Sequence, residues 1–140
     1  MYMIDELDNL WVSGNNNNGM LGLGHTNPVT DFTIVPNIKV SSICSRNGYN
    51  VIIDEDNNPL IAGKFNDIIS PTFINFFDKK VIYVSCGKRH MGFIDENNDV
   101  HMIGCNKYGQ LGNSIKAKMI SCGKFHTAII NLEDRLYVTG

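Results

Sequence analysis

The amino-acid sequence predicts an all-β fold made of stacked repeats. One segment occurs three times, at 41–63, 82–104 and 118–140, and the three copies align without a gap. Each copy alternates short apolar runs with clusters of turn residues, a pattern typical of short strands. No stretch keeps a helical period, and the apolar run at 68–77 is interrupted by Pro71. Repeats of this length mark architectures in which a unit buries its apolar face only against its neighbours.

The strands of a repeat can be placed in order from the third copy. Strands are expected at Val81–Cys86, His90–Ile94 and Val100–Gly104, because these runs are rich in β-branched and apolar residues. A turn at Gly87 separates the first two strands, and the segment 95–99, with the sequence DENND, separates the last two. The other copies repeat this order, so each is expected to form a three-stranded antiparallel meander.

The chain opens with a copy that lacks its first part. Asp5 and Leu10 in that copy correspond to Asp54 and Pro59 in the next one, and nothing before them corresponds to a first strand. The chain is therefore expected to form one partial domain, 1–140. Its repeats are expected at 1–40, which lacks its beginning, at 41–80, at 81–116, and at 117–140, which is truncated.

Composition and charge narrow the class of protein. The chain is 43% hydrophobic and 19% charged, an ordinary balance for a globular domain. No apolar run approaches the roughly 18 residues of a membrane helix, and acidic residues follow Met1 too soon for a secretory signal. The net charge of −2 argues against nucleic acid as a direct partner, which needs a clustered basic face. Four sparse cysteines in apolar runs indicate a reducing compartment, so an intracellular protein, cytoplasmic or nuclear, is expected.

Two glycine-rich loops share the pattern G-x-N-x-x-G-x-L-G. The first copy has GNNNNGMLG from Gly14, and the third has GCNKYGQLG from Gly104. Such glycine density indicates a turn, and the single leucine can enter a core. With the preceding S-C-G-x-x-H and D-E-N-N elements, the pattern resembles the regulator of chromosome condensation repeat, the unit of a seven-bladed β-propeller. The residues of this signature are Gly14, Gly63, Gly87, His90, Gly104, Asn106, Gly109, Gln110, Leu111, Gly112, Gly123, His126 and Gly140.

The resemblance implies a partial β-propeller of about three blades, because a repeat of this family has roughly 50 residues. The second copy departs from the pattern: Arg46 stands where the other copies have Gly87 and Gly123, and Tyr49 stands where they have histidine. The last two closing glycines are only 36 residues apart, so one blade is expected to lack most of its outer strand. Neither the Trp-Asp pairs of a WD repeat nor the double glycine of a kelch repeat recurs in the chain.

One set of residues has the composition of a metal site. Cys86 and His90 in the third copy match Cys122 and His126 in the fourth, and zinc takes four such ligands in a tetrahedron. However, each cysteine closes one strand and each histidine follows a turn, so their side chains are expected to face different neighbours. The favoured interpretation is structural, with a small buried cysteine and a histidine that bonds an adjacent blade. No metal or other cofactor is expected.

The remaining polar residues favour binding over catalysis. The carboxylates Asp54, Glu55, Asp95 and Glu96 recur at one register and are interpreted as turn residues, since acid–base chemistry needs two carboxylates converging on one cleft. The glycine loops match no phosphate-binding motif. The chain is therefore not expected to be an enzyme. Three cations at equivalent turns form a candidate interaction rim: Lys88, Arg89 and Lys124.

These observations predict a protein-interaction platform whose partner is another protein. The family resemblance also implies guanine-nucleotide exchange on a small GTPase as an alternative, although the chain has neither the basic tail nor the protruding wedge that the namesake uses. A second alternative is a non-functional fragment of a larger propeller gene. Because about three blades cannot close a ring, the end blades are expected to present open strand edges, which favours self-association through the terminal half-blades.

Overall fold

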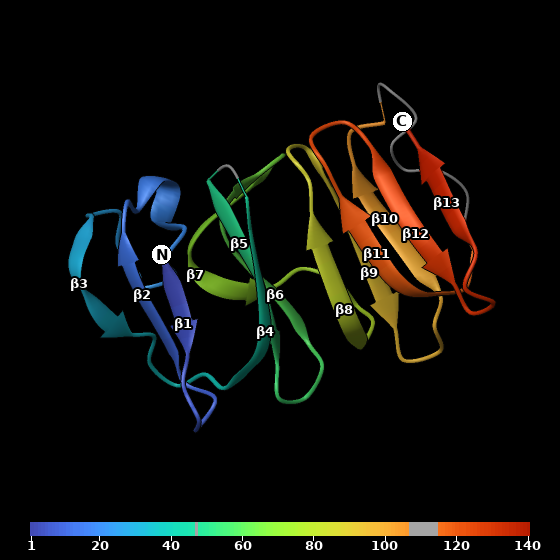
Figure 1. The fold of residues 1–140 in the computed structure, drawn as a ribbon. Helices are drawn as coiled ribbons and strands as arrows, with labels where there is room; N and C mark the ends of the chain where they lie inside the picture. The colour runs from blue at the N-terminus through green and yellow to red at the C-terminus, as the bar shows by residue number, and fades with distance from the viewer. Residues whose placement is uncertain (47, 107–114) are drawn as a thin grey trace. The chain divides into compact units, whose positions relative to one another are not determined.

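The computed structural model describes residues 1–46, 48–106 and 115–140, and within them the fold is all-β, as the sequence predicts (Figure 1). No α-helix occurs in the described residues, which contain one short 3₁₀ turn, η1 (Asn17–Gly19). The strands are β1 (Tyr2–Ile4), β2 (Leu10–Gly14), β3 (Val29–Ile34), β4 (Val40–Arg46), β5 (Tyr49–Asp54), β6 (Pro59–Phe65), β7 (Ile68–Asn75), β8 (Val81–Cys86), β9 (His90–Asp95), β10 (Val100–Gly104), β11 (Ala117–Cys122), β12 (Thr127–Asn131) and β13 (Leu136–Thr139).

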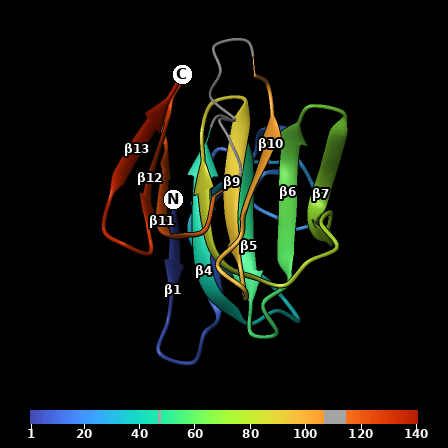
Figure 2. The ribbon, with the colours of Figure 1, turned by 90° about the vertical axis from the view of Figure 1, so that its right-hand side faces the viewer.

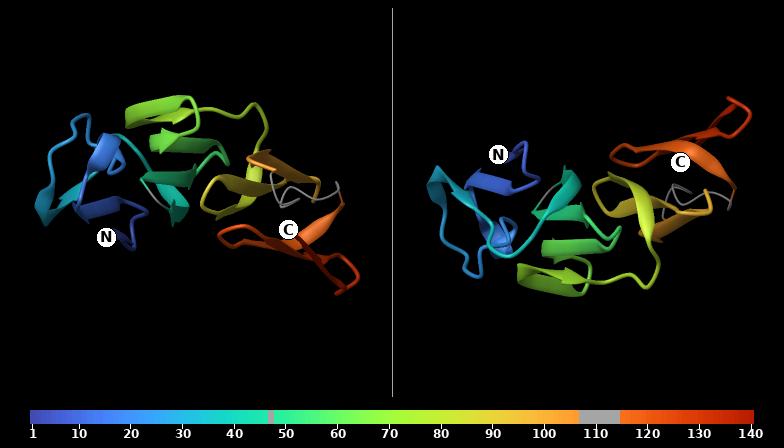
Figure 3. Two further views of the ribbon diagram at one scale, coloured as in Figure 1. Left: turned by 90° about the horizontal axis from the view of Figure 1, so that it is seen from above. Right: turned by 90° about the horizontal axis from the view of Figure 1, so that it is seen from below.

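The strands form small antiparallel sheets in chain order, and the chain divides into two compact units, Met1–Asp78 and Lys79–Gly140. The first unit contains the sheets β1-β2-β3 and β4-β5-β6-β7, and the second contains β8-β9-β10 and β11-β12-β13. Figure 2 shows β6 and β7 side by side at the edge of their sheet, and Figure 3 shows the strands of each sheet end-on. The predicted repeat boundaries within a single domain remain a prediction.

Each unit buries an apolar core between its sheets. In the first unit Leu10, Val12, Val40 and Ile52 are fully buried and pack together with Leu21 from the glycine loop. The second unit has its own cluster, made of Ile94, Val100, Ala117, Ile120, Cys122 and Ile129. A single sheet of this size exposes one apolar face, so the pairing of sheets within each unit supplies the burial that a lone repeat lacks.

One hairpin turn recurs with the same geometry in every sheet. Asp95 Oδ1 accepts hydrogen bonds from the backbone N–H of Asn97 (2.8 Å) and Asp99 (3.0 Å), and Asn98 takes a left-handed φ of +65°. The turns that begin at Asp5, Asp54 and Asn131 repeat these side-chain bonds. A short polar side chain at this position supports a three-residue hairpin that needs a left-handed residue, which confirms the predicted turn role of Asp54 and Asp95.

The structure adds strands that the three-strand prediction omitted. β3 and β7 follow the third strand of their copies, and β7 contains Pro71. The expectation that Pro71 rules out a helix in the apolar run at 68–77 is confirmed, because this segment forms a strand. β7 lies at the edge of its sheet, where a residue without an N–H can be accommodated. The sheet β8-β9-β10 has three strands among the described residues, and the segment that follows it, 107–114, lies outside them.

None of the helical residues that the structure describes forms a segment long and apolar enough to cross a membrane.

Candidate functional site

The S-C-G-x-x-H segments form two tight turns in the second unit, one between β8 and β9 and one between β11 and β12. In the first, the Gly87 N–H donates to the His90 carbonyl (2.7 Å), and in the second the Gly123 N–H donates to the His126 carbonyl (2.8 Å). The imidazole of His90 folds back over Gly87, so that a Cβ at position 87 would stand 2.6 Å from Nδ1. The glycine and the histidine are therefore required together, because the ring fills the space that a side chain would take.

The two turns adjoin and are fixed to each other. A Cβ on Gly87 would stand 2.7 Å from the carbonyl oxygen of Gly123. The Cys122 N–H donates to Ser85 Oγ (2.8 Å), and His90 Nε2 shares a buried hydrogen bond with Thr127 Oγ1 (3.0 Å). The expected role of His90 as a hydrogen-bonding partner of the adjacent sheet is thus confirmed.

His90 is held as a neutral ring. Its side chain is fully buried, and burial lowers its pKa, aided by the nearby His126, against an opposing hydrogen bond with the His126 backbone. His126, by contrast, is exposed. The repeated histidines therefore occupy different environments.

The four residues with a zinc-like composition form no ligand set. Cys86 and Cys122 are buried, and His90 Nε2 faces Thr127. Within residues 1–46, 48–106 and 115–140, no group of three or more histidine, cysteine or acidic side chains could hold a metal ion. The geometry fits the structural interpretation, in which each cysteine packs as a small hydrophobe.

The tips of these turns carry the predicted interaction rim. Arg89 and Lys124 are exposed and Lys88 is half-buried, and Lys124 Nζ lies 5.1 Å from the centre of the Phe125 ring. Within the described part of the chain none of these three cations forms an ion pair. We call this set, Lys88, Arg89, Lys124 and the exposed Phe125, the basic turn end.

Three closing glycines of the signature pack against the equivalent turn of their own sheet. Gly104 has a φ of +116°, and a Cβ there would stand 2.7 Å from the Cα of His90. Gly63 and Gly140 stand in the same relation to Tyr49 and His126. These positions need glycine for both the left-handed angle and the close approach.

In the glycine loop of the first copy, one asparagine side chain holds the loop together through hydrogen bonds to the backbone. Asn16 is fully buried; its Nδ2 donates to the carbonyls of His25 (2.8 Å) and Asn27 (3.0 Å), and its Oδ1 accepts from the Leu21 N–H (2.9 Å). Leu21 enters the core, as its place in the motif predicts. In the third copy the matching residues Gly109, Gln110, Leu111 and Gly112 lie outside the described residues.

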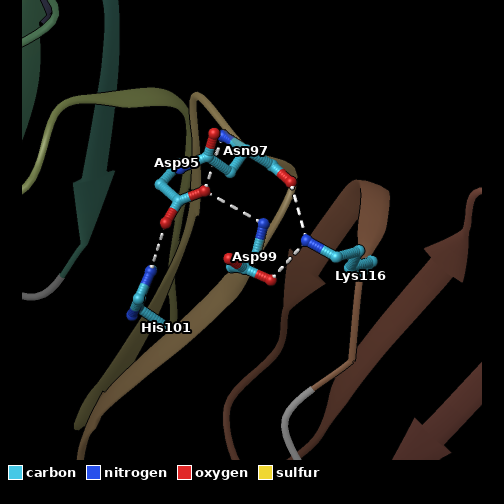
Figure 4. A network of polar contacts seen from close by, with 5 residues as sticks. All are labelled: Asp95, Asn97, Asp99, His101 and Lys116. Atoms are coloured by element: carbon cyan, nitrogen blue, oxygen red, sulfur yellow. Dashed lines mark hydrogen bonds and ion pairs between the residues drawn. The ribbon is translucent and has the colours of Figure 1, made fainter.

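At the opposite ends of the strands, a polar network joins the two sheets of the second unit (Figure 4). His101 Nε2 donates to Asp95 Oδ2 (2.8 Å), and Lys116 Nζ donates to the Asn97 carbonyl (3.1 Å) and to Asp99 Oδ1 (2.9 Å). Burial acts to raise the pKa of Asp95, but the hydrogen bonds from His101 and from the turn N–H groups outweigh it and lower that pKa.

Sequence reasoning missed the lysine in this network. In the first unit Lys39 Nζ donates to the Leu7 carbonyl (3.0 Å) and Asn9 Oδ1 (2.7 Å), which are the positions equivalent to those that Lys116 contacts. The sequence contained a signal for it, because a lysine stands directly before the strands β4, β8 and β11, at positions 39, 80 and 116.

Comparison with known proteins agrees with this geometry. Residues 81–110 match the family model of the regulator of chromosome condensation (RCC1) repeat. The chain is 24% identical over 127 residues to the zebrafish (Danio rerio) Protein RCC2 homolog, a match that covers 80% of this chain and 26% of that protein. The chain thus spans about a quarter of this relative.

Solved structures show the same fold. Human WBSCR16 superposes with a TM-score of 0.83 at 16% identity, over 98% of this chain and 44% of that one. Prp20p from Saccharomyces cerevisiae gives a TM-score of 0.80 at 19% identity, over 98% of this chain and 41% of that one. These similarities establish the fold as that of propeller blades and confirm the predicted partial β-propeller.

Proposed function

We propose that this chain, which belongs to the regulator of chromosome condensation (RCC1) repeat family, acts as a protein-interaction platform. Scaffolds of this kind bind through loops that a rigid framework positions. The chain would serve as an intracellular binding protein and not as an enzyme.

The basic turn end is the observation that carries the proposal. Two adjoining turns are each packed by a glycine–histidine contact, which is buried at His90, and their tips project cations that no described carboxylate neutralises. Rigid presentation reduces the entropy lost on binding, which favours recognition of a partner.

Affinity capture from the native source tests the proposal. Wild-type chain is compared with K88Q/R89Q/K124Q and with K79Q/K118Q/R135Q, which removes the same number of positive charges outside the basic turn end. We expect a stoichiometric protein partner that the first variant loses and the second retains. Equal recovery of the same proteins by all three chains would contradict the proposal.

A small GTPase is a second candidate partner. Prp20p, which shares the fold, was described together with its binding to Gsp1p and histones. If this chain acts in the same way, micromolar protein accelerates release of a fluorescent guanine nucleotide from a Ran-like GTPase. Release at the intrinsic rate would remove exchange activity from consideration.

Another copy of the chain is a third candidate partner. β13 lies at the edge of its sheet and exposes 65% of Leu136 and 66% of Val138. Exposed apolar edge strands pair with other strands. Light scattering is expected to show association that L136K/V138K reverses, and a dispersed wild-type monomer would contradict it.

A further inference from the structure

The charges of residues 79–140 are separated between the two ends of the strands. Every acidic side chain in this unit lies in or beside the turns that join β9 to β10 and β12 to β13: Asp95, Glu96, Asp99, Glu133 and Asp134. The basic turn end lies at the other end of β9 and β12. The sequence from 100 to 132 contains no acidic side chain, and neither does the sequence from 79 to 94.

Three cations at the acidic end form ion pairs, whereas those at the basic turn end form none among the described residues. Lys116 pairs with Asp99 (2.9 Å), Lys118 pairs with Asp134, and Arg135 lies 3.6 Å from Glu133. Among the described residues, no carboxylate reaches the cations at the basic turn end. The two turns touch, so their charges lie within reach of a common ligand and add to one local positive potential.

We infer that the basic turn end binds an acidic polypeptide segment, an inference that rests on the proposed function. Arg89 offers a planar fork of donors that fits a carboxylate. Lys124 is oriented by the Phe125 ring, which is itself 38% exposed and offers an apolar contact beside the charges. A short run of aspartate or glutamate next to an apolar side chain matches this surface. Three cations are too few for a nucleic-acid backbone on a chain of net charge −2.

Fluorescence anisotropy with defined peptides tests the inference. The probe is a labelled twelve-residue peptide with six glutamates and one phenylalanine, and its control replaces every glutamate with glutamine. We expect wild-type chain to bind the acidic peptide with an affinity that falls as salt rises. K88Q/R89Q/K124Q should weaken binding about tenfold or more, and K79Q/K118Q/R135Q, with the same net charge, less than about twofold. Circular dichroism melting verifies that both variants fold, and R89K distinguishes the guanidinium fork from charge alone.

Several outcomes would overturn the inference. These are equal binding of the glutamine peptide, equal losses in the two triple variants, or tighter binding of a single-stranded oligonucleotide than of the acidic peptide. The two proposals fail in different ways. If capture of partners depends on Lys88, Arg89 and Lys124 while the acidic peptide does not bind, the proposed protein-interaction function is supported and the inference of an acidic partner is refuted. If the peptide binds while capture is the same for every variant, the platform falls.

Discussion

The turn between β4 and β5 and the turn between β8 and β9 occupy the same place in two repeats but are built differently. In the first, Tyr49 packs on Phe65 of its own sheet, with ring centres 4.9 Å apart, and position 46 holds an arginine. In the second, the His90 ring lies over Gly87 and bonds Thr127 of the adjacent sheet. Gly87 does not have a left-handed φ. The comparison shows that its neighbours, and not its backbone angle, require the glycine.

Placing arginine at position 87 should reduce the stability of the fold more than the other substitutions. The new Cβ would meet the His90 ring and the Gly123 carbonyl, so G87R is expected to lower the free energy of unfolding by about 2–3 kcal/mol. The reverse change, R46G, should cost less than about 1 kcal/mol, since glycine adds only backbone freedom there. Urea unfolding followed by circular dichroism measures both changes. Equal losses would mean that the two turns do not differ as described.

Introducing both second-copy residues, arginine at position 87 and tyrosine at position 90, should restore part of the stability that G87R loses. In G87R/H90Y the ring that blocks the arginine is replaced by the residue found in the second copy, so we expect about 1 kcal/mol of recovery relative to G87R alone. Recovery should be incomplete, because the Gly123 carbonyl remains close and the hydrogen bond between Thr127 and the His90 ring is lost. A double variant less stable than G87R would contradict the coupling between the two positions.

The two turns should also differ in their response to pH. Burial lowers the pKa of His90 in the folded chain from 6.5, so below about pH 6.5 the unfolded chain binds a proton that the folded chain resists. Stability contributed by the neutral ring is therefore present above pH 6.5 and is lost as the pH falls below it, by up to about 1.4 kcal/mol per unit. Unfolding at pH 7.5, 6.5 and 5.5 measures this slope. G87R/H90Y, which has tyrosine as in the second copy, should lack it, and parallel slopes would rule His90 out as the cause.

Local features of the repeats could be predicted from the sequence, whereas contacts between repeats could not. The strands and the turn at 95–99 follow from local signals, namely short apolar runs and a side chain that bonds its own turn. The spacing Cys86 to His90 is the same for a metal ligand pair and for a packed turn, and only the direction of the His90 ring decides between them. The lysine contacts join residues far apart in sequence, so a single copy gives no indication of them.

Substitution of Thr127 tests its hydrogen bond to His90, a contact that the turn of the second copy lacks. T127V keeps the shape of the side chain and removes the hydroxyl that bonds His90 Nε2, at a buried position. One lost hydrogen bond between buried groups should cost about 1–2 kcal/mol. In the G87R/H90Y background the same substitution should cost less, because the imidazole partner is absent. Urea unfolding of the four chains gives the coupling, and an equal cost in both backgrounds would show that Thr127 acts through something other than His90.

Substitutions at the other ends of the strands, near the hairpin turns that bind Lys39 and Lys116, should change stability least. The two units have equivalent contacts there. Lys39 and Lys116 each bond a backbone carbonyl and a side-chain oxygen of the preceding hairpin turn. Lys116 and Asp99 are 58% and 45% exposed, so water and salt screen the pair. We therefore expect K39Q and K116Q to cost about 0.5 kcal/mol each, or about 1–2 °C in melting temperature, with the K116Q loss reduced at high salt. Thermal unfolding of the two variants measures this, and a loss above about 2 kcal/mol in only one of them would show that the two lysines do not play equivalent roles, each within its own unit.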